Sequence, residues 1–129
     1  MAPINEGQHT GEFIVSELPS RGSRSTGTLS SGQNLTDGQC LGLSGGELVA
    51  LPTTLNSAGE LAGSGVVGIL IGDWDASATG TNADIPDVPY LDWTASVKED
   101  LITFPAGANP KAATIRGLKA KGIKVLDTL

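Results

Sequence analysis

Nucleophilic catalysis would need a nucleophile with a base held beside it, and this sequence contains one cysteine and one histidine. His9 falls in an N-terminal stretch so poor in apolar residues that we expect nothing to fix its ring. Cys40 lies in an apolar segment and is predicted to be a small buried hydrophobe rather than an activated thiol. One histidine and one cysteine also cannot form a zinc site. We therefore expect a non-enzymatic protein with no catalytic residue, cofactor or metal.

An acidic segment resembles the first half of a calcium-binding loop. Asp73 and Asp75 take alternate positions in Asp73–Thr79, and Asp84 falls at the twelfth position. However, the sixth position is Ala78 where a sharp turn requires glycine, and Asp84 replaces the bidentate glutamate. The segment is predicted to be an acidic surface loop, and whether it binds a cation is left open.

Residues 63–68 match the glycine pattern of dinucleotide-binding loops by letter. That loop requires a strand before it and a helix after it, so that the pyrophosphate meets a helix N-terminus. Here the apolar run Val66–Ile71 follows, and its length and β-branched residues predict a central strand. The glycines are therefore interpreted as turn and strand-entry residues.

Composition indicates one domain built mainly from strands and turns. The 129 residues include 18 glycines and seven prolines, with 39% hydrophobic and 17% charged residues. The net charge of −6 argues against nucleic acid or an anionic membrane as a partner. No export signal or membrane span is recognisable, so we expect synthesis in a reducing cytoplasm.

Charge is distributed unevenly along the chain. Five of the eight basic residues lie between Lys111 and Lys124, and no acidic residue occurs from Leu101 to Leu126. Seven of the fourteen acidic residues lie between Asp73 and Asp100. The basic cluster is either a solvated helix face or a docking patch for an acidic partner.

The N-terminal segment is predicted to be a flexible arm that docks on a partner. Its only compact apolar island is Phe13-Ile14-Val15, which has the composition of a strand. A segment this polar cannot offset its ordering entropy by burial of its own. We therefore divide the chain into an arm, residues 1–34, and a β-rich domain, residues 35–129.

Within the domain, turn residues separate short predicted elements. We expect a hairpin of residues 39–43 and 47–51 around Ser44-Gly45-Gly46, a loop over 73–88, and a strand over 101–104. Asn109 as N-cap, Pro110 at the first position and Gly122 as stop predict a helix over 110–121. A final strand is expected over 123–126. With aromatic residues at only 4%, Trp74 and Trp93 are candidates for either core or interface.

The order of these segments resembles the lambda-type head decoration proteins of tailed bacteriophages, the capsid-cementing family. The resemblance extends from Gly11 to Leu126. Phe104 departs from it, since a tryptophan is expected before this proline in many members. The segments that carry it are Gly11–Glu17, the basic Ser/Thr stretch 20–27, Leu29–Leu35, Asp37–Gly42, Gly46–Leu51, Gly65–Leu70, Ile102–Gly107, a Lys/Ala helix and a Gly-Ile-Lys-Val-Leu strand.

The resemblance implies a β-clip or β-tulip-like domain with one or two short helices. It implies a homotrimer on the outer surface of the expanded head, at three-fold and quasi-three-fold sites, that stabilises the head against DNA pressure. It further implies that the N-terminal arm adds a strand to the major capsid protein. The capsid-binding candidates are Glu12, Phe13, Ile14, Val15, Ser16, Glu17, Arg21 and Arg24, and the candidates for a trimer or capsid interface are Trp74, Trp93, Phe104 and Pro105.

Two alternatives from other classes stay open at this stage. The chain could be another trimeric virion component, of the tail or fibre, or a soluble protein-binding module. A tail component would copurify with tails, whereas a decoration protein would bind expanded but not immature heads. A carbohydrate-binding module would need an aromatic platform, which this sequence barely supplies.

Overall fold

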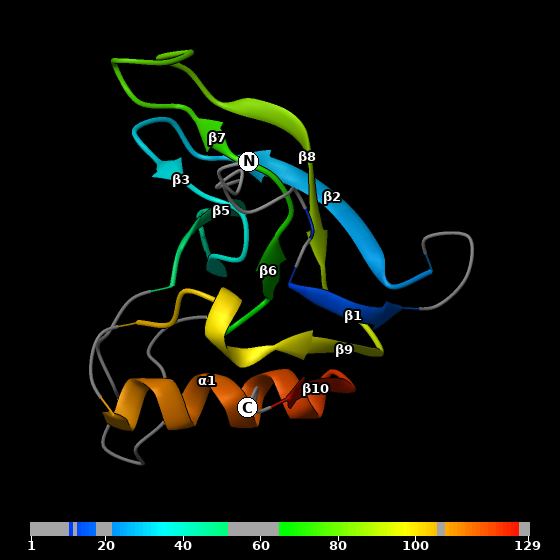
Figure 1. Cartoon of the computed structure of the whole chain (residues 1–129). Coiled ribbons are helices and arrows are strands. Elements are labelled where there is room, and N and C mark those ends of the chain that lie inside the picture. The colour runs from blue at the N-terminus through cyan, green and yellow to red at the C-terminus, as the bar shows by residue number, and fades with distance from the viewer. Residues whose placement is uncertain (1–10, 12, 18–21, 52–64, 106–107, 127–129) are drawn as a thin grey trace, which may run out of the picture.

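The computed structural model of the chain describes residues 11, 13–17, 22–51, 65–105 and 108–126, and in these the predicted mainly β fold is confirmed (Figure 1). No helix among these residues is long and apolar enough to cross a membrane. The elements in chain order are β1 (Ile14–Glu17), β2 (Arg24–Leu29), β3 (Asn34–Leu35), β4 (Cys40–Ser44), β5 (Glu47–Ala50), β6 (Gly68–Leu70), β7 (Trp74–Asp75), β8 (Ile85–Leu91), β9 (Ala95–Lys98), the 3₁₀ helix η2 (Glu99–Leu101), α1 (Ala108–Ala120) and β10 (Ile123–Leu126).

Five strands close into a small barrel in the order β2-β5-β4-β6-β8. The predicted hairpin forms its β4–β5 part, with Leu41 opposite Ala50 and Ser44 opposite Glu47. The two residues at its tip, Gly45 and Gly46, have φ of 59° and 83°, a conformation that glycine adopts without a steric penalty. Turn chemistry therefore fixes the register of this hairpin.

The predicted central strand is confirmed as β6, which pairs with β4 on one side and β8 on the other. All three of its residues are buried. Ile69 and Leu70 point to opposite faces and belong to two different apolar clusters. Burial on both faces explains why the sequence here is a continuous apolar run rather than an alternating one.

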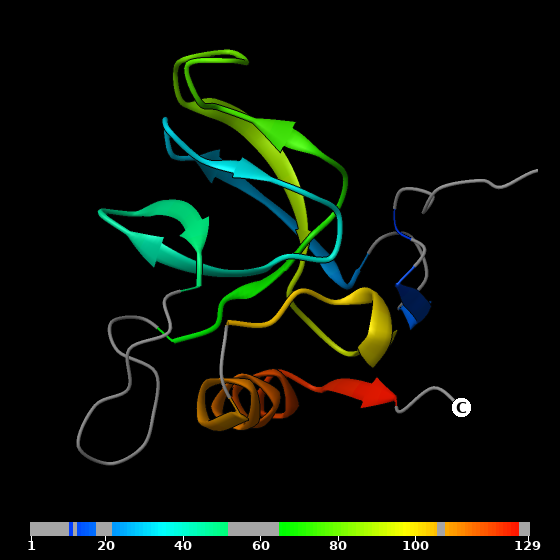
Figure 2. The same cartoon turned by 60° about the vertical axis from the view of Figure 1, so that its left-hand side comes forward.

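A second layer consists of the three-stranded sheet β1-β9-β10 and helix α1. Strands β9 and β10 are parallel, with Ile123 opposite Ala95, so the chain must cross over between them, and α1 lies on that connection. The helix ends at Ala120, and the predicted stop residue Gly122 follows with a φ of 80°, a conformation that glycine adopts easily. Figure 2 shows α1 and β10 together at one end of the molecule, far from the β7–β8 connection.

Alternating side chains divide the core between the barrel interior and the space between the two layers. The barrel interior holds Leu29, Leu35, Leu41, Leu48, Leu70, Ala76 and Val88. The interlayer cluster holds Phe13, Cys40, Leu51, Val66, Ile69, Ile71, Leu91, Ala95, Val97, Ile102, Ala113, Leu118 and Ile123.

Three local expectations were wrong. Residues 73–88 are not all loop, because β7 pairs with β3 and β8 already begins at Ile85, where pairing with β2 lets Val88 point into the barrel. Residues 101–104 form no strand: Leu101 is the last residue of η2, and the residues after it make a single bridge, Thr103 to Gln39. Helix α1 starts at Ala108, so Asn109 lies inside the helix rather than at its cap.

The structure also differs from the expected boundary between an arm and a domain at residue 34. Strand β2 belongs to the barrel, where β5 and β8 flank it, and hydrogen bonding to two neighbours stabilises a strand with few apolar residues. Strand β1 pairs with β9 of its own chain, and Phe13 is 0% exposed. The acceptor for the apolar island is therefore within the domain.

Candidate functional site

Strand β1 is anchored to the domain by burial and by main-chain hydrogen bonds. The Phe13 carbonyl accepts a hydrogen bond from the Lys98 amide over 2.8 Å, and the Ile14 amide donates to the Gly11 carbonyl over 3.0 Å. The Phe13 side chain lies in the interlayer cluster, whereas Val15 on β1 is 50% exposed. Among the described strands, β1 pairs only with β9, so its other edge has no partner strand in the described part of the chain.

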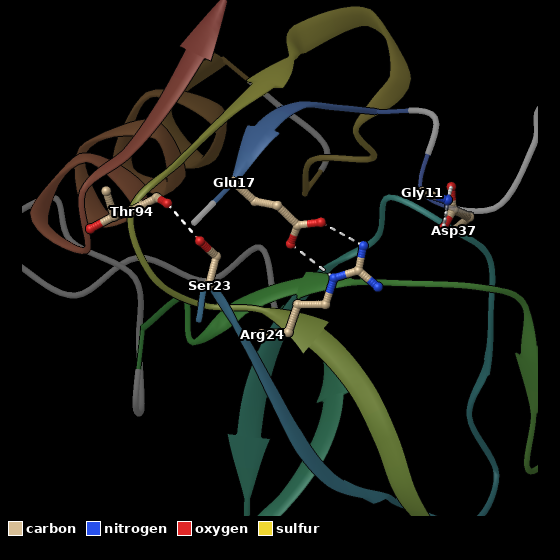
Figure 3. A network of polar contacts seen from close by, with 6 residues as sticks. All are labelled: Gly11, Glu17, Ser23, Arg24, Asp37 and Thr94. Carbon is tan, nitrogen blue, oxygen red and sulfur yellow. Dashed lines mark hydrogen bonds and ion pairs between the residues drawn. The ribbon is translucent and has the colours of Figure 1, made fainter. Parts of the chain in front are cut away.

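An ion pair joins β1 to the barrel (Figure 3). Two nitrogens of Arg24, Nε and Nη2, donate to the two carboxylate oxygens of Glu17 over 2.9 and 2.7 Å. The hydrogen bond to Glu17 is the main cause of the raised pKa of Arg24. Both side chains are about a quarter exposed, so the pair contributes more to the position of β1 than to stability.

Asp37 ties the start of the described N-terminal segment to the barrel. Both of its carboxylate oxygens accept the Gly11 amide hydrogen bond, each over 3.0 Å (Figure 3). One of them also accepts the Gly72 amide over 2.6 Å. Hydrogen bonds to an ionised carboxylate are among the stronger ones in proteins. Asp37 therefore holds the backbone of Gly11 next to the segment that joins β6 and β7.

Ser23 holds the β8–β9 turn. Its hydroxyl donates to the Thr94 carbonyl over 2.7 Å (Figure 3). Its carbonyl accepts the Asp92 and Trp93 amides over 3.0 and 3.3 Å. Ser23 is fully buried. Trp93 lies in the same turn and is 54% exposed. The hydrogen bonds to Ser23 therefore hold the backbone that carries this exposed aromatic side chain.

The predicted capsid-binding residues fall into three groups. Glu12 and Arg21 lie outside the described residues. Phe13 is buried in the core, so its side chain is not accessible to a partner while β1 stays in place, and its expected role as a capsid contact stays a prediction. The other candidates lie on β1 or next to it: Ile14 and Glu17 partly buried, Val15 and Ser16 exposed, and Arg24 paired with Glu17.

The four interface candidates differ in exposure. Trp93 is the most exposed of them. Trp74 is half-buried against the barrel cluster, and its Nε1 donates to the Ile71 carbonyl over 2.8 Å. Phe104 packs against the interlayer cluster under the ammonium of Lys111, 5.2 Å from the ring centroid, and Pro105 is buried.

Sequence reasoning missed Asp37 and Ser23, which fix the positions of β1 and Trp93. Each acts through one hydrogen-bonding side chain on residues far away in the chain, such as Gly11 or Thr94. Isolated polar residues of this kind belong to no periodic or spaced sequence pattern that would reveal their role. The only local signal was the Asp37-Gly38 pair, which indicates a turn.

The candidate chemical groups have structural roles where they are described. The predicted burial of Cys40 is confirmed, and desolvation raises the pKa of its thiol to about 12, so the reactive thiolate is disfavoured. His9 lies outside the described residues. In the glycine pattern, a Cβ on Gly68 would lie 2.6 Å from the Leu91 carbonyl oxygen, so this glycine allows β6 and β8 to approach closely.

The carboxylates of the acidic segment, residues 73–84, accept hydrogen bonds from different residues. Asp75 accepts hydrogen bonds from the Ser77 amide and hydroxyl and from Thr79, and the Ser77 bonds lower its pKa. Asp73 accepts the Asp37 amide over 2.8 Å, and Asp84 accepts the Ser31 amide over 2.8 Å. In the part of the chain that the structure describes, no three His, Cys, Asp or Glu side chains are placed to hold a metal ion.

Taken together, the fold defines a small β-barrel domain with a flanking sheet, whose exposed features are an open strand edge and a rigidly held tryptophan. Surfaces of this kind serve strand pairing and protein–protein contact. A family model described as bacteriophage lambda head decoration protein D matches residues 3–123, and the chain belongs to this family. It is a head decoration protein of a bacteriophage, and its family binds the phage capsid, which confirms the resemblance seen in the sequence. No curated protein matches the chain.

Proposed function

We propose that this protein binds as a homotrimer to the outer surface of the expanded head, at three-fold and quasi-three-fold sites, and stabilises the head against the pressure of packaged DNA. The observation that supports this most is the matching of the head decoration family over residues 3–123. The net charge of −6 suits a protein on the outer side of the shell, away from the DNA.

The open edge of β1 is the proposed contact with the coat protein. An extended coat segment that adds to this edge would gain main-chain hydrogen bonds, and exposed Val15 would select the site. Phe13 and the Glu17–Arg24 pair fix β1 in advance, so little ordering entropy is lost on binding. This preorganisation replaces the loose docking arm expected from composition, while Glu12 and Arg21 remain proposed contacts.

Three copies acting together would strengthen a weak single contact. Once one edge is paired, the other two edges of the trimer meet their coat segments at high effective concentration, which raises avidity by roughly 10²–10⁴. Each trimer would then connect the coat subunits around a three-fold site and oppose their separation.

A binding assay with undecorated heads tests this proposal. Purified protein is mixed with expanded or immature heads, and the bound fraction is measured after sedimentation. We expect saturable binding to expanded heads only, in multiples of three copies per site. Equal binding to both forms, or binding to neither, would contradict the proposal.

A matched pair of variants tests the edge itself. Val15→Asp places a charge on the proposed edge, whereas Leu43→Asp places one on the β4–β5 hairpin at a residue of similar exposure, 42% against 50%. We expect Val15→Asp to weaken binding by about tenfold, the loss expected from a desolvated charge at an interface. Leu43→Asp should bind as the wild type does, and both should melt normally.

A further inference from the structure

We propose a second coat-binding site at the opposite edge of the same sheet, in the groove between α1 and β10, with an extended acidic segment of the coat shell as its occupant. This inference rests on the proposed function and adds a contact surface to it. The groove has a volume of about 410 Å³ and is lined by Ile115, Lys119, Gly122, Ile123, Lys124 and Val125.

The geometry of β10 favours an extended occupant. Strand β10 pairs only with β9 among the described strands, so within the described residues no strand covers its outer edge, which we call the open edge. The Gly122 carbonyl accepts the Ala95 amide over 3.2 Å, which turns Gly122 toward β9. Because successive residues of a strand alternate in direction, Ile123 and Val125 turn their main-chain groups toward the open edge. A peptide lying in the groove can therefore continue the sheet.

The charge of the groove favours an acidic occupant. Lys119 and Lys124 are exposed on its two walls, while Ile115 and Val125 are partly buried and supply an apolar floor. No acidic residue occurs in the sequence from Leu101 to Leu126. Lys111, by contrast, is paired with Glu99 over 2.9 Å at the other end of the helix, so its charge is already partnered within the chain.

The charge of the whole molecule favours the shell as the source of that segment. The protein carries −6, yet α1 and β10 contain only basic charges and lie at the end opposite the connection between β7 and β8, where Asp75, Asp84 and Asp87 lie (Figures 1 and 2). A molecule with this asymmetry approaches an acidic surface with its basic end first. The family binds the capsid, so the coat is the partner that this end would meet.

The first test removes the two groove charges. The double variant Lys119→Gln/Lys124→Gln is compared with the control Ser44→Glu/Thr81→Glu, which changes the net charge by the same −2 at exposed residues remote from the groove. Affinity for undecorated expanded heads is measured at low and at physiological salt. We expect the groove variant to bind about tenfold more weakly than the control at low salt, with the difference shrinking as salt rises.

The second test addresses the strand edge. Val125→Pro removes a main-chain donor from the open edge, which a proline tolerates because the donor does not belong to the β9 ladder. Val125→Ala shortens the same side chain and keeps the donor. We expect Val125→Pro to lose more affinity for heads than Val125→Ala does, with both variants folded by circular dichroism.

The possible results separate this inference from the proposed function. Failure of the wild type to bind expanded heads would overturn the proposed function as a whole. Normal binding by the wild type, with the groove variant equal to its charge control, would overturn the groove site alone. A groove variant that changes the oligomeric state of the free protein instead would show that a second copy of the chain fills the groove, which also overturns the coat segment as occupant.

Discussion

Single residues decide whether the N-terminal segment is a loose arm or part of the domain. Phe13 lies in the interlayer cluster, and Asp37 holds Gly11 through its carboxylate. Phe13→Ala should therefore lower the free energy of unfolding by about 3–5 kcal/mol, the usual cost of removing a buried aromatic ring. Val15→Ala, at a half-exposed residue of the same strand, should change it by less than about 0.5 kcal/mol.

Urea unfolding of the free protein measures both values. The composition of the segment alone predicts the opposite for Phe13, namely a loss of capsid affinity with normal melting. A Phe13→Ala protein as stable as the wild type would therefore show that β1 is detached from β9 in solution.

Cys40 makes stability depend on pH in the alkaline range. Its pKa is raised from 9.0 to about 12 by burial, so between these values the folded protein keeps a proton that the unfolded chain releases. Stability must then fall as pH rises through this range, by about 1.4 kcal/mol between pH 8 and pH 10 from this thiol alone. The alkaline slope should be shallower in Cys40→Ala, and identical slopes would contradict the buried thiol.

Some helices and strands of this fold can be predicted from the sequence and others cannot, because only some have a local sequence signal. The β4–β5 hairpin, β6, α1 and β10 carry local information in their turn glycines, helix boundaries and apolar runs. Strand β2 has almost no apolar pattern, and pairing on both sides within the barrel forms it. The composition of residues 13–15 predicts a strand at β1 but not its partner, because pairing with a strand about 80 residues later leaves no trace in the local sequence.

The same limit applies to the candidate site. Exposure of Trp93 follows from the position of its turn, which Ser23 fixes from a distant segment. The burial of Pro105 and Phe13 likewise depends on how the two layers pack. Residue type indicated which side chains were important, and only the packing separated contact residues from anchors.

Gly117 in α1 affects stability in two opposite ways that can be measured separately: it lowers helix propensity and it leaves room for Val66. Gly117→Ala should gain about 1 kcal/mol of helix propensity. The new Cβ would lie 2.5 Å from Cγ1 of Val66, a buried and rotationally stiff side chain, and overpacking of this kind costs about 1–3 kcal/mol. We therefore expect a net loss of stability in the wild-type background.

Thermal unfolding of four proteins checks this balance: the wild type, each single variant and Gly117→Ala/Val66→Ala. With Val66 truncated, the same Gly117→Ala change should become stabilising. A stabilising effect in both backgrounds would mean that α1 does not pack against Val66.

At the scale of the whole molecule, Trp93 is the residue most suited to hold copies together. It is the most exposed of the four interface candidates and sits on a rigid turn, and exposed tryptophans of this kind often carry more than about 2 kcal/mol of binding energy. If the proposed homotrimer already forms in the free protein, Trp93→Ala should shift it from trimer toward monomer while each copy stays folded. Sedimentation equilibrium measures this, and an unchanged distribution would place the trimer contact elsewhere.

In the proposed mode of capsid binding, both edge strands of the sheet β1-β9-β10 contact the coat protein. The edge of β1 pairs with the coat through a preorganised strand, and the basic groove at β10 receives an acidic coat segment. Strand β9 pairs with both β1 and β10 and sets the separation of these edges, while the Glu17–Arg24 pair and a shared core join the sheet to the barrel. Rigid spacing of contacts is what allows a small domain to resist the separation of coat subunits.

The central claim is that β1 stays part of the domain and meets the coat with its open edge. Electron cryomicroscopy of expanded heads decorated with this protein tests it most directly. We expect β1 still paired with β9 in every bound copy, with a coat strand alongside its outer edge and three copies around each three-fold site. A bound state in which β1 has left β9 to enter the coat, or in which the outer edge of β1 faces solvent, would contradict it.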